Sequence, residues 1–180
     1  MPKSSHLIPE NTVATLRLKL LPGGYNDPSQ GWLEGVATKA SSGSIYLRFQ
    51  CEVQSGEHRA KTFYTIIGLH SPKGNFWRKM GRQRILDLLN SQAGVANDDY
   101  SDQALKYRRL RSLKDLNGLK FNAVITIKKD QNGKLINDIG KIISRENEGT
   151  SSQRRRLRQT DLTAKLTQAE TKPMWLVDKV

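Results

Sequence analysis

Ser44-Ile-Tyr-Leu-Arg-Phe-Gln-Cys-Glu-Val53 is the stretch of this sequence that decides the fold. Successive side chains of a β-strand point to opposite sides, so the stretch has two different faces. The apolar face, which requires a core, comprises Ile45, Leu47, Phe49, Cys51 and Val53. The polar face comprises Tyr46, Arg48, Gln50 and Glu52. A ring beside a guanidinium group suits a nucleic-acid strand, but the same alternation also fits an ordinary amphipathic strand with a solvated outer side.

The chain of 180 residues is strongly basic, with 30 Lys and Arg against 17 Asp and Glu and a formal net charge of +13. Residues 1–144 carry 22 basic and 12 acidic side chains, a net of +10, and residues 145–180 carry 8 and 5, a net of +3. Such a field attracts polyanions, of which nucleic acid is the commonest. An anionic membrane is the less favoured alternative, because no strongly amphipathic basic helix with a large apolar face is present.

The cysteine content and the apolar runs indicate where the protein resides. Cys51 is the only cysteine, so an intrachain disulfide is excluded, and its strand position predicts a small core residue rather than a reactive thiol. No apolar run approaches the roughly 18 residues that span a bilayer, and the first residues lack the apolar core of a signal peptide. We expect a soluble cytoplasmic protein with no membrane partner.

Hydrophobic periodicity predicts a mainly β fold with one helix. The predicted strands are residues 12–20, 31–39, 44–53, 59–69, 121–129 and 134–143. Short turns join the first four strands, which favours an antiparallel meander, and an Asn-Gly turn joins the last two. Residues 75–92 have apolar side chains at helical spacing, and the helix ends near Gly94. Gly81 lies on the same stripe, where its missing side chain would let the helix sit close to a sheet.

These elements describe a small, strongly curved antiparallel barrel with one packed helix, which is typical of the oligonucleotide-binding (OB) fold. The usual OB barrel has a helix after its third strand; here the helix falls later, which a bent strand counted twice would explain. An open sheet with a helix across it is the alternative. Residues 1–144 are the predicted nucleic-acid-binding domain. Residues 145–180 are a predicted flexible basic tail with Arg154-Arg-Arg-Leu-Arg158, a short helix at 161–170 and an apolar tip at 173–177.

No catalytic constellation is convincing, so we expect a protein without enzymatic activity, cofactor or metal. The three His residues lack metal-ligand spacing, and no phosphate-binding glycine motif occurs. Asp98, Asp99 and Asp102 could hold the divalent cation of a nuclease, but an acidic loop without a catalytic role is the favoured interpretation. Glu34 and Glu52 are the next candidates, and each fits an ordinary outward carboxylate better.

Aromatic and basic side chains alternate along the predicted strands, which favours a binding module. Base stacking contributes about 1–3 kcal/mol per base and tolerates any sequence. The predicted nucleic-acid-binding residues are Trp32, Lys39, Tyr46, Arg48, Lys61, Tyr64, Arg108, Arg109, Arg111, Lys128 and Lys129. A core position is a strong alternative for Trp32, and solvated turn lysines are an equal alternative for Lys128 and Lys129. Trp77 on the helix is assigned to the core.

A series of short motifs resembles a known family. The motifs are Trp32-Leu-Glu-Gly35, Gly43-Ser-Ile-Tyr-Leu47, Glu52-Val53 with Gly56, Trp77 with Gly81-Arg82, Leu88-Leu-Asn-Ser91, Asp115-Leu-Asn-Gly118 and Asn132-Gly133. Their order, over about residues 12–144, is similar to that of single-stranded-DNA-binding-like OB proteins of phages and of integrative or conjugative elements. The resemblance implies a protein that coats single strands in replication or recombination of such an element, as an oligomer. It carries over no catalytic residue.

The sequence therefore predicts a non-enzymatic single-stranded DNA-binding protein. Bacterial replication-type single-strand binders end in an acidic tip, whereas this tail is basic and ends Pro173-Met-Trp-Leu-Val-Asp-Lys-Val180. The tip could dock on its own barrel, on a neighbouring subunit or on a recombination or replication protein. The competing functions are a metal-dependent nuclease and an RNA-binding or adaptor protein that acts through the tail.

Overall fold

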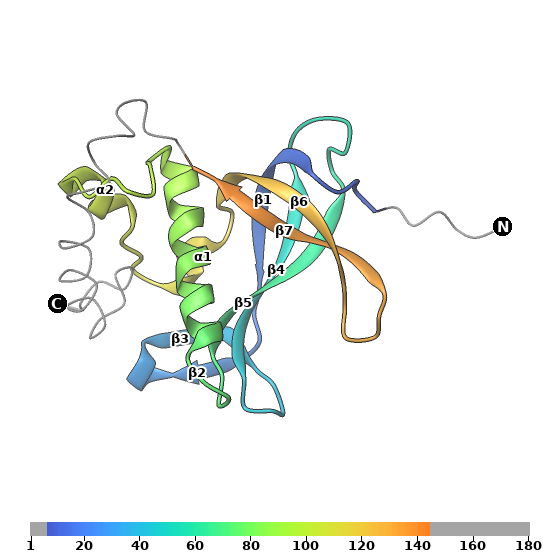
Figure 1. The fold of residues 1–180 in the computed structure, drawn as a ribbon. Helices are drawn as coiled ribbons and strands as arrows, with labels where there is room; N and C mark the ends of the chain where they lie inside the picture. The colour runs from blue at the N-terminus through green and yellow to red at the C-terminus, as the bar shows by residue number, and fades with distance from the viewer. Residues whose placement is uncertain (1–6, 145–180) are drawn as a thin grey trace.

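The computed structural model describes residues 7–144, which form a curved antiparallel β-sheet with a helix packed against it (Figure 1). The strands are β1 (Thr12–Leu21), β2 (Tyr25–Asp27), β3 (Trp32–Lys39), β4 (Ile45–Val53), β5 (Thr62–His70), β6 (Lys120–Lys129) and β7 (Leu135–Ile143). The helices are α1 (Phe76–Ala93) and α2 (Asp102–Tyr107), with 3-10 turns η1 (Pro28–Gln30) and η2 (Leu113–Leu116). The predicted mainly β fold with one packed helix is confirmed. The predicted tail, 145–180, lies outside the described residues.

Five long strands build the barrel in the order β5-β4-β1-β6-β7, and every pairing is antiparallel. The backbone ladder does not close between β7 and β5, but side chains bridge them. Thr65 Oγ1 on β5 donates a hydrogen bond to Asp138 Oδ1 on β7 at 2.6 Å, and Lys128 Nζ lies 2.5 Å from the other carboxylate oxygen. Among these five strands, α1 follows the third along the chain, as in the usual OB barrel. The predicted OB-like fold is confirmed in this partly open form.

The helix comes later along the chain than in the usual OB barrel because a hairpin is inserted before it. The predicted explanation, one bent strand counted twice, is wrong. β2 and β3 form a hairpin inserted between β1 and β4, and β3 joins the main sheet only through Thr38 and Lys39. Earlier in β3, Glu34 and Gly35 both have φ near +65°, which turns the strand away from the sheet. Because β3 leaves the sheet, the rest of this edge of β4 pairs with β1, from Leu21 opposite Arg48 to Leu16 opposite Val53. The predicted four-strand meander is therefore wrong in its strand order.

The inward faces of the strands and one stripe of α1 share a single hydrophobic core. All five apolar side chains of β4 are buried, as its alternation predicts. Ile85, Leu88 and Leu89 of α1 are buried where the helix packs on β5, β6 and β7. Cys51 belongs to this core, and its burial, with a smaller effect of the Asp138 charge, raises the pKa of the thiol to about 12. The thiol therefore stays protonated, which confirms the predicted core role.

α1 approaches β5 at a pair of glycines. A Cβ atom added to Gly81 would lie 1.7 Å from the carbonyl oxygen of Gly68, and one added to Gly68 would lie 2.6 Å from Cε2 of Trp77. Real Cβ atoms essentially never come within 3.0 Å of such neighbours. The prediction that Gly81 lets the helix sit close to a sheet is confirmed, and its partner on the sheet is Gly68.

Replacing Gly81 by Ala tests this contact. In an unconstrained helix interior, Gly→Ala stabilises by roughly 0.5–1 kcal/mol. Here the added methyl group collides with the backbone of β5, so we expect Gly81→Ala to lower the free energy of unfolding by about 1–3 kcal/mol or more. Urea denaturation followed by circular dichroism measures the change, with Lys79→Ala at an exposed position of the same helix as the control. A Gly81→Ala protein as stable as the wild type would refute the close approach.

Candidate nucleic-acid interface

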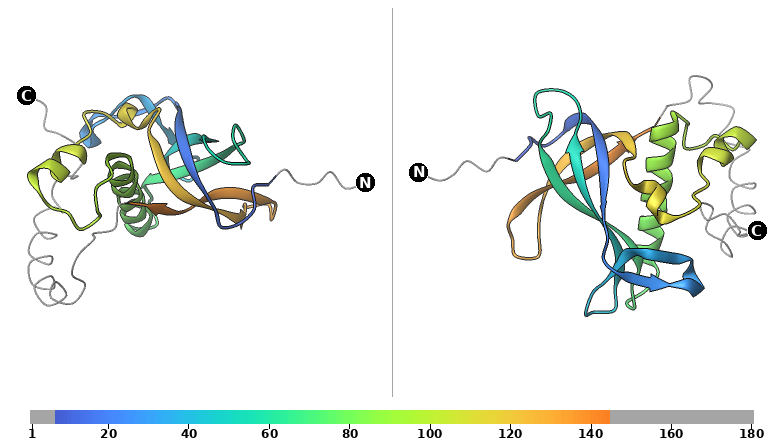
Figure 2. Two further views of the ribbon diagram at one scale, coloured as in Figure 1. Left: turned by 90° about the horizontal axis from the view of Figure 1, so that it is seen from above. Right: turned by 180° about the vertical axis from the view of Figure 1, so that it is seen from behind.

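The outward side chains of β1, β4 and β5 form a continuous surface, here called the outer face; Figure 2 shows these three strands side by side from two directions. The strand register arranges its side chains in rows that cross all three strands. The rows are Arg17–Glu52–Thr62, Lys19–Gln50–Tyr64 and Leu21–Arg48–Ile66. Neighbouring rows are ~6.7 Å apart, since their residues are two positions apart along a strand.

The outer face combines exposed apolar side chains with cations. Tyr64 is 63% exposed and Ile66 is 45% exposed, although both lie within a central stretch of β5. Arg48 lies next to Ile66 on β4, and Arg17 and Lys19 lie one strand further away on β1. All three cations are exposed, and none of them forms an ion pair within residues 7–144. Glu52 is the only acidic side chain of the rows. The surface can therefore offer a ring and an apolar side chain to bases, and cations to phosphates.

Four of the predicted site residues lie on the outer face or beside it. Arg48 and Tyr64 belong to its rows. Tyr46 occupies the next outward position of β4 and is half-buried, with its ring centroid 6.1 Å from that of Trp77 and the two planes tilted by 42°. Lys61 is half-buried in the turn before β5. Tyr46 is thus less available for stacking than Tyr64, because Trp77 covers part of it.

Three other predicted residues have structural partners; two of them are buried, and the third, Lys128, is exposed but ion-paired. Trp32 is 6% exposed and belongs to the core. Arg108 is 2% exposed, and its guanidinium donates hydrogen bonds to Asn90 Oδ1 at 2.7 Å and to the Ala96 carbonyl at 2.9 Å. Lys128 forms the ion pair with Asp138 already described. Burial contradicts the predicted nucleic-acid contacts of Trp32 and Arg108, and Lys128 is not the free hairpin lysine that the sequence suggests.

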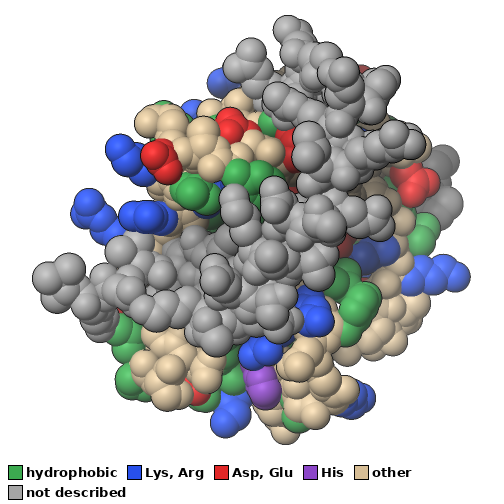
Figure 3. Space-filling model, turned by 60° about the vertical axis from the view of Figure 1, so that its left-hand side comes forward, with side chains coloured by type: hydrophobic (Ala, Val, Ile, Leu, Met, Phe, Trp, Pro, Cys, Tyr) green, Lys and Arg blue, Asp and Glu red, His purple; other side chains and the backbone are tan. Residues whose placement is uncertain are grey.

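The remaining predicted residues are exposed but lie outside the rows of the outer face. Lys39 Nζ lies 5.1 Å from the ring centroid of Tyr25, at the β2–β3 hairpin. Arg109 and Arg111 lie between α2 and η2, and Lys129 lies at the end of β6. On the helical side of the molecule, Lys and Arg side chains occur at several separate places on the visible surface (Figure 3). The structure therefore does not gather these cations with Arg48 and Tyr64.

Sequence reasoning missed three members of the outer face. Arg17 and Lys19 point outward in the alternation of β1, but nothing local places β1 beside β4. Ile66 is apolar and points away from the core, on the opposite side from Phe63 and Ile67. An apolar residue out of phase with the buried set of its strand is the sequence signal that could have found it.

The acidic loop is explained by local structure. Asp99 Oδ1 accepts a hydrogen bond from the backbone N–H of Ser101 at 2.9 Å, and this bond lowers the pKa of Asp99. Asp102 lies in the first turn of α2, where negative charge is favourable. Glu34 accepts a hydrogen bond from Ser112 Oγ at 2.8 Å. Within the described part of the chain, no three His, Cys, Asp or Glu side chains are grouped so that they could hold a metal ion.

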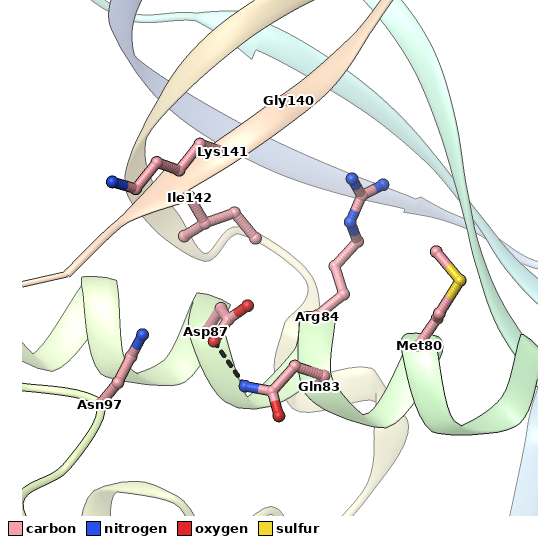
Figure 4. Close-up of a pocket in the computed structure, with 8 residues that line it drawn as sticks. All are labelled: Met80, Gln83, Arg84, Asp87, Asn97, Gly140, Lys141 and Ile142. Carbon is pink, nitrogen blue, oxygen red and sulfur yellow. Dashed lines mark hydrogen bonds between the residues drawn. The ribbon is translucent and has the colours of Figure 1, made fainter. Parts of the chain in front are cut away.

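A cleft with a volume of about 380 Å³ lies between α1 and β7 (Figure 4). Its lining residues are Met80, Gln83, Arg84, Asp87, Asn97, Gly140, Lys141 and Ile142. Gln83 Nε2 donates to Asp87 Oδ1 at 2.8 Å, and Arg84 Nη2 donates to the Ile139 carbonyl at 2.7 Å. Partial burial raises the pKa of Asp87, although Gln83 and Arg84 act in the opposite direction. The Arg84 bond ties α1 to β7, so the polar lining has a structural role.

Comparisons with known proteins assign no family to this chain. No protein-family model matches the sequence, and no curated protein matches it either. The resemblance to phage and mobile-element OB proteins therefore stays a prediction. Among residues 7–144, no helix is long and apolar enough to cross a membrane.

The burial of Asp87 predicts a pH-dependent effect of Asp87→Asn. A raised pKa means that the folded state binds a proton more readily than the unfolded state, so ionised Asp87 costs stability at neutral pH and this cost disappears as the pH falls through the raised pKa. Asn keeps an oxygen acceptor for Gln83 and carries no charge. We expect Asp87→Asn to have a higher melting temperature than the wild type at pH 7, with a smaller gain at pH 4. A gain that is the same at both pH values, or a loss at pH 7, would contradict this account.

Proposed function

We propose that this protein binds single-stranded DNA, without chemical turnover, on the outer face of β1, β4 and β5. The observation that carries the proposal is the exposure of Tyr64 and Ile66 among cations that have no ion-pair partner within the described residues. Such exposure suits a surface that meets bases. In OB barrels, the face of the second and third strands is a common oligonucleotide surface. β4 and β5 are the second and third barrel strands of this chain.

The composition of the outer face favours unpaired strands over duplex. A side chain can stack on a base only when the flat face of the base is accessible, and in a duplex these faces are covered by neighbouring base pairs. Arg17, Lys19 and Arg48 can neutralise phosphates of either form. The preference for single strands therefore comes from Tyr64 and Ile66, whereas the cations raise affinity for both forms.

The proposed biological setting follows from the motif resemblance and from the basic charge. We place the protein in the cytoplasm, where it would coat unpaired strands during replication or recombination of a phage or mobile element. Assembly into oligomers, and an interaction of residues 145–180 with a replication or recombination protein, are part of this proposal. The net charge of +10 on residues 1–144 supports rapid association with any such strand.

Removing the exposed ring tests the outer face directly. Tyr64→Ala should weaken binding to a fluorescent oligo-dT by about 5- to 150-fold, which corresponds to the loss of one stacked base. Tyr107→Ala is the matched control, because this ring is 48% exposed but lies at the end of α2. Fluorescence anisotropy measures affinity, and circular dichroism confirms folding. Equal losses in the two variants, or none in either, would exclude Tyr64 from the binding surface.

The same titrations should separate the cations from the rings. Lys19→Ala with Arg48→Ala should make the slope of log K against log salt concentration shallower by about 0.7 for each phosphate contact removed.

The wild-type protein should bind oligo-dT more tightly than duplex of the same length at one salt concentration. Equal affinity for duplex would refute the proposal, and cleavage of the strand with Mg²⁺ or Mn²⁺ would indicate a nuclease instead.

A further inference from the structure

The outward positions of β5 end at a glycine, and a side chain of α1 lies over it. Tyr64 and Ile66 occupy two successive outward positions, and the next outward position is Gly68, which has no side chain. The indole of Trp77, in the first turn of α1, fills the vacant place. Figure 1 shows α1 beginning beside the end of β5. A ring borne by the helix thus takes the position that a β5 side chain would have.

The indole lies flat on the glycine. A Cβ atom added to Gly68 would be 2.6 Å from Cε2, 2.7 Å from Cδ2 and 2.7 Å from Nε1 of Trp77. These three atoms belong to one five-membered ring, so a point this far from all of them lies above the ring face rather than in the ring plane. A Cβ atom on an outward strand position points away from the sheet. One face of the indole therefore rests on the β5 backbone, and the opposite face is directed away from the sheet.

Neighbouring contacts hold the ring in this orientation. Tyr46, which pairs with Gly68 across the strands, packs against the indole with ring centroids 6.1 Å apart. Gly81, one helical turn after Trp77, fixes the height of the helix above β5. Trp77 nevertheless remains partly exposed. A ring already held in place loses little conformational freedom when a ligand stacks on it.

We propose that Trp77 is a base-stacking residue, and that the bound strand follows β5 from Tyr64 past Ile66 to the helix. The ligand group is the face of an unpaired nucleobase, and the inference rests on the function proposed above. With ~6.7 Å between successive outward positions, this path covers on the order of 13 Å. The sequence assigns Trp77 to the core; the structure gives the indole one packed face and one outward face.

Tryptophan fluorescence of the full chain tests the assignment. In a Trp175→Phe background, the remaining tryptophans are Trp77 and Trp32, and Trp32 is buried in the core. Oligo-dT should quench the emission of this protein as it binds. The matched control is the same background with Trp77→Phe, which keeps only Trp32 and should show no quenching. Anisotropy of a labelled oligo-dT measures binding independently in every sample.

A second variant measures the energetic contribution of the ring. Trp77→Leu keeps an apolar side chain over Gly68 but removes the ring, and it should weaken oligo-dT binding by about 5- to 150-fold. Circular dichroism and the melting temperature show whether the variant is folded. Binding without quenching of Trp77, together with unchanged affinity of folded Trp77→Leu, would overturn the inference and leave the proposed function standing. Failure of the wild-type protein to bind oligo-dT in the anisotropy assay would overturn the proposed function, and the role of Trp77 with it.

Discussion

The close contact between α1 and β5 at Gly68 and Gly81 is the constraint on which the rest of the structure depends. Because neither residue has a side chain, the helix backbone comes directly against the strand. This position brings Ile85 and Leu88 of α1 into the core of the barrel. It also sets Trp77 over the glycine of β5. A single steric condition thus closes the core and determines which ring lies at the end of the outer face.

The two faces of β4 separate the core from the proposed binding surface. Leu47, Phe49 and Cys51 are completely buried, so the inward side chains of this strand supply its packing. The outward positions are then free to carry residues that do not stabilise the fold. On the neighbouring strand, Ile66 is an exposed apolar side chain that the core does not require. An exposed apolar side chain at this position brings no gain in packing, and together with the exposed Tyr64 ring it supports the proposed binding surface without showing it.

Local patterns predict the elements of this fold well, because strand alternation and helical spacing depend on residues close in sequence. The long strands, α1 and the packing role of Gly81 all follow from such patterns. The pairing of β1 with β4 does not, because it requires β3 to turn away at Glu34, a residue type that rarely adopts a positive φ. The burial of Arg108 likewise depends on acceptors from Asn90 and Ala96, which only the folded chain brings together. Charge alone cannot distinguish such an arginine from an exposed one.

The site could be predicted only in part for the same reason. Arg48 and Tyr64 are correctly placed by alternation within a strand, but the rows that join them to Lys19 and Ile66 arise from register between strands. The resulting surface has few groups that can read the edges of bases, with Gln50 as the amide in its centre. In the proposed complex, its cations would meet a charge common to all nucleic acids, and its ring and apolar side chains would meet base faces that only unpaired strands expose. On the proposed function, the cations would add affinity for single strands and duplex alike, and the rings would add affinity only for strands whose base faces are accessible.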